Sequence, residues 1–372
     1  MNSKDVPLVN LYGLDRDGLI GALAPLGLET YRAKQVFGQM YRRGVCDPLQ
    51  WTDMPSAVRQ LLSSQMRVEP PRIKSSVAAL DGTVKYVLEL PAGGQVEAVA
   101  IPAEERMTFC ISSQVGCAYG CTFCMTAKLG FIRHLSPGEI VGQVDALLSA
   151  TDTPRSQHNV VFMGMGEPLH NIDNVLKAIE ILTDEDAFAL GPRRITVSTV
   201  GVVNGIDRLL AARVVPRLAV SLVAADQEVR AALMPIARSV TLDDLAAAVR
   251  RFGDGKRDLP TYEVVLLDAV NDSPRLAHQL GDFAVRSRAK VNLIEFNPTP
   301  LLPYAPASEE RMNFFLKILK QRGVIGTVRR SRGKDAFAAC GQLAFLQRSD
   351  DGGAQSAFPL RTAPPVVPRS TA

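Results

Sequence analysis

The sequence predicts an α/β fold: a partial (βα)6 barrel that carries a small N-terminal helical domain and a short β-hairpin segment. Two observations lead to this prediction. Short apolar runs alternate with amphipathic segments between residues 102 and 347, and repeated strand–helix units of this kind form parallel sheets with right-handed crossovers. Residues 1–70, in contrast, show only helical periodicity.

The N-terminal part, residues 1–70, is predicted to be a helical domain. Apolar side chains recur at helical spacing from Leu11 to Leu23, and Pro25 then breaks the pattern. A second apolar set runs from Ala33 to Tyr41.

The next part, residues 71–101, is predicted to be a β-hairpin. The runs Lys85–Leu90 and Gln95–Ile101 have strand character, and Pro91-Ala92-Gly93-Gly94 separates them.

Residues 102–347 are predicted to form the barrel. Its expected strands are Asn159–Met163, Arg194–Val200, Arg217–Leu222, Thr261–Leu267, Lys290–Phe296 and a last one near Gly326–Arg330. Helices are expected between them, for example Asn174–Leu182, Leu242–Arg251 and Arg311–Gln321. Ligand sites in such folds lie at the C-terminal ends of the strands. The remaining residues, 348–372, are rich in Pro, Ala, Ser and Gly without periodicity and are predicted to be a disordered tail.

The composition indicates a cytoplasmic enzyme with no membrane segment. The chain has 372 residues, of which 47% are hydrophobic, and its net charge is a mild +4. No apolar run approaches the roughly 20 residues that a spanning helix needs, and the first residues do not resemble a signal peptide. Six cysteines, three of them crowded together, do not resemble a secreted disulfide framework and favour a reducing compartment.

The crowded cysteines are Cys117, Cys121 and Cys124, with the spacing C-x3-C-x2-C. Cubane iron–sulfur clusters are held by four thiolates, so three would leave one iron open to another ligand. A zinc site is the alternative, with His134 as the nearest downstream histidine. The wide gap to His134 and the flanking Tyr119 and Phe123 favour the cluster.

Small polar residues follow the predicted strands at points where a ligand would bind. Gly166 and Glu167 belong to the run Met163–Pro168, where glycine lets a backbone approach a ligand closely. Ser198, Ser221 and Asn297 stand at the ends of three later strands. Any one of them is more often a cap or a turn residue, but strand ends of one barrel converge, so together they predict a pocket.

Three strings taken together resemble one enzyme family. They are Phe109–Cys117, Met163–Pro168 and Ala338–Leu343, and the likeness extends from about Tyr31 to Ala344. The family is the RlmN/Cfr family of radical S-adenosylmethionine RNA methyltransferases. The resemblance implies a radical S-adenosylmethionine core over residues 102–347, with a [4Fe-4S] cluster on Cys117, Cys121 and Cys124 and S-adenosylmethionine on its open iron.

The resemblance also implies a role for individual residues. Cys340 would carry a methyl group, a radical formed on that methyl would add to an adenine ring carbon, and Glu97 would accept the ring proton. Cys110 would then release the RNA by forming a disulfide with Cys340. Sulfur suits both cysteine roles, because thiolates are nucleophiles and leaving groups in exchange. The residues implied to bind S-adenosylmethionine are Gly166, Glu167, Ser198, Ser221, Leu222, Val223 and Asn297.

The partners follow from the same resemblance, which also implies that the helical domain of residues 1–70 binds RNA. The expected substrate is an adenosine of 23S rRNA, methylated at ring carbon 2, and tRNA is a second candidate substrate. A low-potential donor such as flavodoxin or ferredoxin would supply electrons, and we expect a monomer. Three local basic clusters are candidates for phosphate contacts: Lys34 with Arg42 and Arg43, Arg193 with Arg194, and Arg329–Lys334.

Two positions depart from the family pattern. Val223 stands where a histidine is usual, and Phe337 replaces an acidic residue near Cys340. Three alternatives therefore stay open: methylation at ring carbon 8, as in the Cfr branch; methylation at another RNA position; and an iron–sulfur RNA-binding protein that is not an enzyme. The alternative that the protein is not an enzyme gives the Cys110 and Cys340 pair no role.

Overall fold

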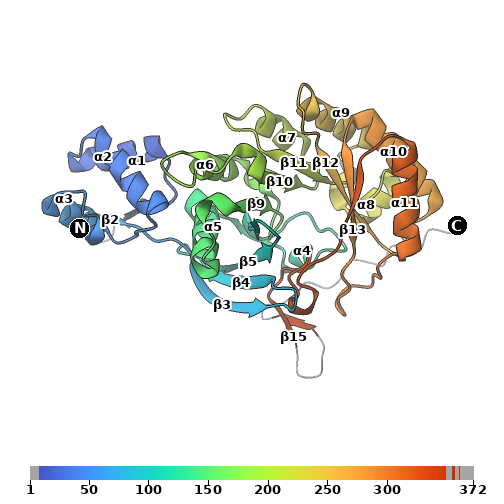
Figure 1. The fold of residues 1–372 in the computed structure, drawn as a ribbon, viewed down its shortest axis with the longest axis horizontal. Helices are drawn as coiled ribbons and strands as arrows, with labels where there is room; N and C mark the ends of the chain where they lie inside the picture. The colour runs from blue at the N-terminus through green and yellow to red at the C-terminus, as the bar shows by residue number, and fades with distance from the viewer. Residues whose placement is uncertain (1–7, 349–353, 357–359, 361–372) are drawn as a thin grey trace.

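The computed structural model describes residues 8–348, 354–356 and 360. Figure 1 shows two parts, a small helical domain at one end and a larger α/β domain. Within the described residues, no helix is long and apolar enough to cross a membrane.

The N-terminal domain is helical, as predicted. Its helices are α1 (Arg16–Leu23), α2 (Thr30–Phe37) and α3 (Ser56–Gln65), with the short turns η1 (Ala24–Leu26), η2 (Gly38–Arg42) and η3 (Pro48–Gln50). Two very short strands, β1 (Val9–Asn10) and β2 (Met66–Arg67), pair in parallel and close the domain. Its core is apolar and aromatic, with Trp51, Tyr41 and Phe37 fully buried.

A single ten-stranded sheet organises the larger domain, in the order β14-β13-β12-β11-β10-β9-β6-β5-β4-β3. From β6 to β14 all neighbours are parallel, and from β6 to β3 they are antiparallel. Its strands are β3 (Arg72–Ala78), β4 (Val84–Glu89), β5 (Gln95–Pro102), β6 (Met107–Cys110), β9 (His158–Phe162), β10 (Ile195–Thr199), β11 (Arg217–Ser221), β12 (Thr261–Leu266), β13 (Lys290–Glu295) and β14 (Gly326–Arg329).

Helices follow the parallel strands and cover the outer face of the sheet (Figure 1). They are α5 (Pro137–Thr151), α6 (Ile172–Thr183), α7 (Val203–Leu210), α8 (Gln227–Leu233), α9 (Leu242–Gly253), α10 (Pro274–Ser287) and α11 (Glu309–Gln321), with the turns η4 (Arg155–Gln157), η5 (Pro168–Asn171), η6 (Pro192–Arg194), η7 (Pro235–Arg238) and η8 (Lys334–Ala336). Helix α5 begins with a capping box between Ser136 and Glu139. The predicted partial (βα)6 barrel is confirmed, and every predicted barrel strand lies within one residue of an observed one.

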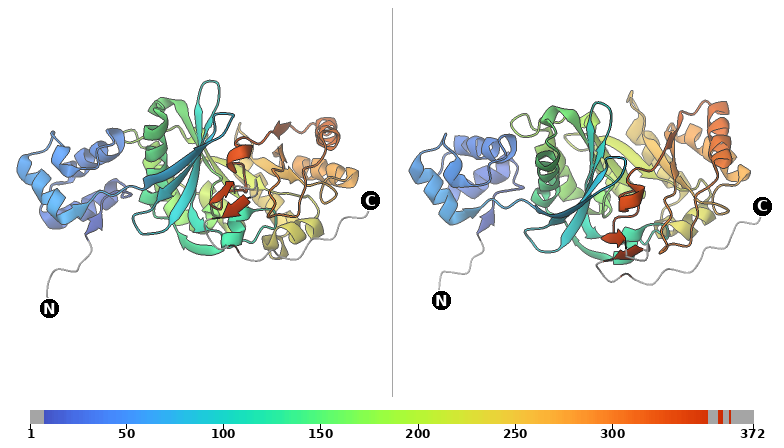
Figure 2. Two further views of the ribbon diagram at one scale, coloured as in Figure 1. Left: turned by 90° about the horizontal axis from the view of Figure 1, so that it is seen from below. Right: turned by 60° about the horizontal axis from the view of Figure 1, so that its bottom comes forward.

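The hairpin segment differs from the prediction. Strands β4 and β5 form the expected hairpin, but β3 pairs with β4, and β5 pairs with β6. Because β6 pairs on its other side with β9, the hairpin extends the barrel sheet instead of standing alone. Figure 2 shows these antiparallel strands curving away from the parallel part of the sheet.

The C-terminal segment begins differently from the predicted tail. Strand β15 (Leu346–Arg348) pairs antiparallel with β16 (Ala354–Ser356), so Arg348 and Ala354–Ser356, which the prediction placed in the tail, belong to a β-ladder. Residues 349–353, 357–359 and 361–372 lie outside the described part of the chain.

Candidate active site

The three motif cysteines lie on the loop between β7 (Gln114–Gly116) and α4 (Met125–Leu129), which β8 (Phe131–His134) closes. The backbone of this loop is tied at three points: Cys117 N–H donates to Gly130 O at 2.9 Å, Thr122 N–H to Leu233 O at 3.0 Å, and Met125 N–H to Gly341 O at 2.7 Å. The last bond joins the loop to the C-terminal segment that carries Cys340.

The environment of these thiols fits an iron–sulfur cluster. Burial raises the pKa of all three, that of Cys117 to about 12. Metal ligation requires the thiolate, and bound iron supplies the positive charge that makes a buried thiolate stable. No three His, Cys, Asp or Glu side chains of the described residues could hold a single metal ion. A cubane cluster does not require three side chains around one metal ion, because each cysteine binds a different iron.

The Gly166–Glu167 segment follows β9 and is tightly held. Gly166 has φ +97°, and a Cβ there would stand 2.5 Å from Cβ of Gln114, so only glycine fits. The Glu167 carboxylate is buried and accepts hydrogen bonds from Leu169 N–H at 3.0 Å and Val200 N–H at 2.8 Å. Burial nevertheless raises its pKa to about 7.

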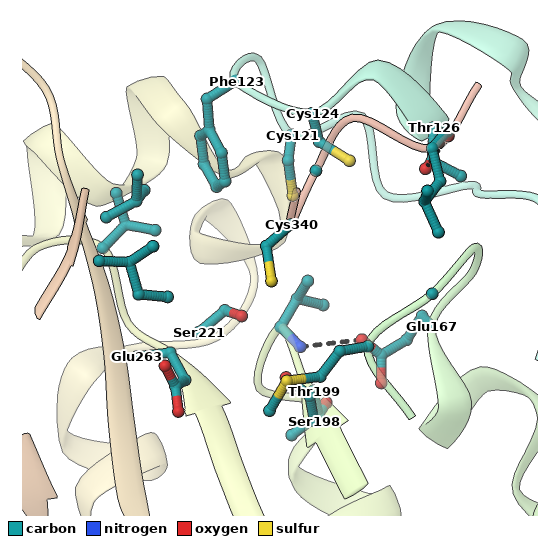
Figure 3. A pocket seen from close by; sticks show the side chains of 18 of the residues that line it. Cys121, Phe123, Cys124, Thr126, Glu167, Ser198, Thr199, Ser221, Glu263 and Cys340 are labelled. Atoms are coloured by element: carbon teal, nitrogen blue, oxygen red, sulfur yellow. Dashed lines mark hydrogen bonds between the residues drawn. The ribbon is translucent and has the colours of Figure 1, made fainter. Parts of the chain in front are cut away.

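A cavity of about 170 Å³ lies at the C-terminal ends of the parallel strands, opposite the cysteine loop. Most of the predicted cofactor residues line it, together with Cys121, Cys124 and Cys340: Gly166, Glu167, Ser198, Ser221, Val223 and Asn297. In Figure 3 the Cys340 side chain projects between the cysteine loop and the strand ends of Ser198 and Ser221. Leu222 is the exception, because its side chain is fully buried in the core and does not line the cavity.

Two of these residues have a distinctive local geometry. Asn297 is held by Gln342, whose Oε1 accepts from Asn297 Nδ2 at 2.8 Å. Val223 has φ +65°, a conformation that β-branched residues rarely adopt, and its carbonyl accepts from Asn271 Nδ2 at 2.9 Å.

Cys340 also borders a second cavity, of about 370 Å³, whose lining includes Cys110. All six cysteines are free thiols in this structure, so the Cys110–Cys340 disulfide stays a prediction. Cys110 is buried, which raises its pKa to about 12, whereas Cys340 is exposed.

Glu97 lies on β5, an interior strand of the sheet, and it is fully buried. Glu97 is therefore not a solvated carboxylate on an edge strand. Its Oε1 forms an ion pair with Lys85 Nζ at 3.0 Å, and its Oε2 accepts from Phe345 N–H at 2.8 Å. Because Val99 pairs with Cys110, and Glu97 is two residues from Val99, Glu97 and Cys110 share one face of the sheet.

Two charged residues line these cavities without a predicted place in the cofactor site, although Arg329 belongs to a predicted phosphate-binding cluster. Arg329, at the end of β14, lines both cavities, and its Nη1 lies 3.4 Å from Met163 Sδ. Glu263, on β12, lines the first cavity and accepts from Asn292 Nδ2 at 2.9 Å. Alternation along strands β12 and β14 was the only available signal, because neither residue belongs to a motif.

The basic clusters are partly neutralised within the protein. Lys34 and Arg42 both face Asp186, at 3.5 and 4.0 Å, and Arg330 pairs with Glu309 at 2.8 Å. The N-terminal cluster thus contributes to docking its own domain, since Asp186 also binds Arg16 at 2.6 Å.

Comparisons with known proteins agree with this geometry. The Radical SAM superfamily matches residues 111–279, and the ribosomal RNA large subunit methyltransferase N-terminal domain matches residues 9–68. A radical SAM methyltransferase from Sphaerobacter thermophilus is 40% identical, with a TM-score of 0.84, and the match covers 90% of this chain and 99% of that one. A spore photoproduct lyase mutant is 15% identical over 60% of this chain and 76% of its own, with a TM-score of 0.44.

The two matched families and the extent of the Sphaerobacter match establish the family, and with it a [4Fe-4S] cluster and S-adenosylmethionine as cofactors and RNA as the class of substrate. The chain belongs to the RlmN/Cfr family of radical S-adenosylmethionine methyltransferases.

Proposed function

We propose that this enzyme methylates ring carbon 2 of an adenosine in 23S rRNA, with tRNA as a second substrate, through a methyl group carried on Cys340. The observation that carries the proposal is the position of Cys340. It borders both the cavity of Glu167 and the cluster cysteines and the cavity of Cys110. One sulfur can therefore take a methyl on the cofactor side and be attacked from the Cys110 side.

The cluster and S-adenosylmethionine together supply the radical that activates the methyl group. Around it, Cys117, Cys121 and Cys124 hold the iron, while the Glu167 carboxylate accepts hydrogen bonds from the cofactor ammonium. Ser198, Ser221, Asn297 and the backbone at Val223 complete the pocket. The backbone of Leu222 contributes to this turn, and its side chain packs in the core.

Release of the product uses Glu97 and Cys110. Glu97 accepts the proton that leaves the ring carbon, and burial strengthens it as a base by raising its pKa. The Cys110 sulfur then bonds to Cys340 sulfur while the bond from that sulfur to the transferred carbon breaks. The new methyl group takes up a proton, and one surplus electron remains, which the cluster held by Cys117, Cys121 and Cys124 would be able to accept. A thiol reductant must reopen the disulfide before the next turnover.

The electron donor is a small low-potential protein such as flavodoxin or ferredoxin, and the enzyme acts as a cytoplasmic monomer in this proposal. Methylation at carbon 8 or at another RNA position is the competing possibility. Mass mapping of modified adenosines in rRNA and tRNA from a deletion strain separates these, because each position leaves a different fragment unmodified. If the deletion strain keeps every modified adenosine of the wild-type strain, the proposal is refuted.

Two variants test the individual roles. Cys110→Ala should trap a covalent RNA adduct on a denaturing gel, and peptide mass spectrometry should find a methyl on Cys340 of the active enzyme. Cys46→Ser, at a position outside both cavities, is the control.

Replacement of Cys117, Cys121 and Cys124 together should abolish iron and sulfide incorporation on anaerobic reconstitution. Zinc bound by these cysteines in the wild type, in place of iron and sulfide, would contradict the cluster assignment.

A further inference from the structure

Gln114 stands at the centre of a hydrogen-bond network beside the cofactor pocket. It is fully buried, and its side-chain Oε1 accepts from Glu167 N–H at 2.8 Å. Its backbone N–H donates to Met165 O at 3.2 Å. Gln114 thus hydrogen-bonds to both end residues of the segment Met165-Gly166-Glu167, and its Cβ packs against Gly166.

Two histidines bind the other end of the same amide. Gln114 Nε2 lies 3.1 Å from Nδ1 of His134 and 3.0 Å from Nδ1 of His170. The two imidazole rings lie 4.8 Å apart and nearly perpendicular. His170 is exposed and His134 is half-buried, so water reaches both.

The hydrogen bonds of Gln114 determine which ring nitrogen of His134 and of His170 carries the hydrogen. Glu167 N–H is a donor, so the amide oxygen must face it, and the amide NH2 must face the histidines. The two hydrogens of that NH2 then need one acceptor each. Both Nδ1 atoms are therefore unprotonated, and both rings carry their hydrogen on Nε2 when neutral.

A proton on either Nδ1 breaks this arrangement. An N–H would then face the N–H of the amide, and neither can accept. Rotating the amide would present its oxygen to the imidazolium but would turn NH2 toward Glu167 N–H. One buried donor loses its partner in either case, and that carries a desolvation penalty.

The surrounding charges do not remove this conflict. Arg133 is paired with Glu139 at 2.7 Å, and the phenol of Tyr119 belongs to a ring 5.7 Å from that of His170. The Glu167 carboxylate faces Leu169 and Val200 instead of the pair. Burial, and after it the neighbouring His170, lower the pKa of His134.

We propose that Gln114 is a positioning residue for the segment Met165–Glu167, and that protonation of His134 releases this segment and weakens S-adenosylmethionine binding. The inference rests on the proposed role of Glu167 as the acceptor for the cofactor ammonium. It assigns to His134, which lies outside the cavity lining, a pH-dependent control of the cofactor site.

The first test is nitrogen NMR of ¹⁵N-histidine-labelled apoprotein. The chain has four histidines, so single substitutions assign every ring. At pH 7.5 both His134 and His170 should show hydrogen on Nε2 alone. Hydrogen on Nδ1 of either ring at that pH would overturn the assignment, whatever the catalytic activity.

The second test is calorimetric titration of S-adenosylmethionine into anaerobically reconstituted protein between pH 5.5 and 8. Protonation of Glu167 alone gives a tenfold loss of affinity per pH unit. Protonation of His134 adds a second proton, so the affinity of the wild type should fall by more than tenfold per unit at the acid end. The variant H134N/H170N, whose amide oxygens accept without titrating, should lose only tenfold per unit.

Two further variants sharpen the second test. Gln114→Glu offers a carboxylate to Glu167 N–H and to an imidazolium alike, so its acid dependence should also fall to tenfold per unit. His278→Asn, on the outer helix α10, is the control and should match the wild type. Equal slopes for the wild type and H134N/H170N would refute the pH control. Wild-type affinity in Glu167→Gln at pH 8 would instead refute the role of Glu167 and leave the NMR result standing.

Discussion

Lys85 and Glu97 form a buried ion pair across strands β4 and β5, with Nζ 3.0 Å from Oε1 and side chains that are 3% and 1% exposed. The pair places the proposed proton acceptor beside a fixed cation inside the sheet. Its two contributions, to stability and to catalysis, can be separated by mutation.

Lys85→Met should lower the free energy of unfolding by about 3 kcal/mol, because it leaves a buried carboxylate without its cation. The double variant Lys85→Met with Glu97→Leu should recover most of that loss, yet it should form no methylated RNA. Denaturant unfolding and a methyl-transfer assay measure the two effects. Lys334→Met, which removes a partly exposed pair with Glu295, should cost less than about 1 kcal/mol. Methylated RNA from the double variant would exclude Glu97 as the proton acceptor.

Glu167 should make the stability of the apoprotein fall as pH rises. Its pKa of about 7 exceeds the ordinary value of 4.5, so the folded state binds more protons between these two values. This group stabilises the fold below pH 4.5, and that stabilisation, up to about 3 kcal/mol, is lost as pH rises through 7. Cofactor binding should have the opposite trend, since it needs the carboxylate. Thermal melts with and without S-adenosylmethionine, compared between the wild type and Glu167→Gln, would show both, and a pH-independent difference would contradict the pKa assignment.

Arg329 should assist the release of the product. Its guanidinium lies close enough to lower the pKa of Cys110, which burial otherwise raises. Removing this cation raises the pKa of Cys110 and so reduces its thiolate fraction. Arg329→Met should therefore prolong the lifetime of the covalent RNA adduct, by about tenfold for each pKa unit of that rise, and a higher pH should partly restore release. Denaturing gels over a time course measure this. Arg330→Met, which removes the neighbouring cation paired with Glu309 and leaves Arg329 in place, should resolve the adduct at the wild-type rate once the adduct has formed.

Val223→His should tighten S-adenosylmethionine binding without changing the methylated atom. Histidine adds one neutral hydrogen bond, worth on the order of 1 kcal/mol or about fivefold in affinity. Histidine is also not β-branched, so it tolerates the φ of +65° better and should stabilise the fold. Calorimetry and mass analysis of the modified adenosine provide the measurements. Val223→Ala separates relief of strain from the new hydrogen bond, and a change of the methylated atom would show that this position contacts the base.

The sequence alone determined the local features. The period of apolar residues located the barrel strands to within one residue, because strands buried under helices are continuous apolar runs. The spacing of Cys117, Cys121 and Cys124 and the Gly166-Glu167 turn predicted a cofactor site, since both depend on neighbours a few residues away. Strand β3 was missed because it is exposed along its whole length, with no alternation of burial.

Tertiary structure decided the contacts between distant residues. Only the folded sheet brings Arg329 to Cys110, and no pattern along the chain records that pairing. The predicted hairpin already pairs the strands of Lys85 and Glu97, but only its place inside the larger sheet buries their ion pair. Only packing makes Gln114 face Glu167 on one side and two histidines on the other. The energies that matter at this site, burial of charge and completion of hydrogen bonds, arise from side chains that the chain keeps far apart until it folds.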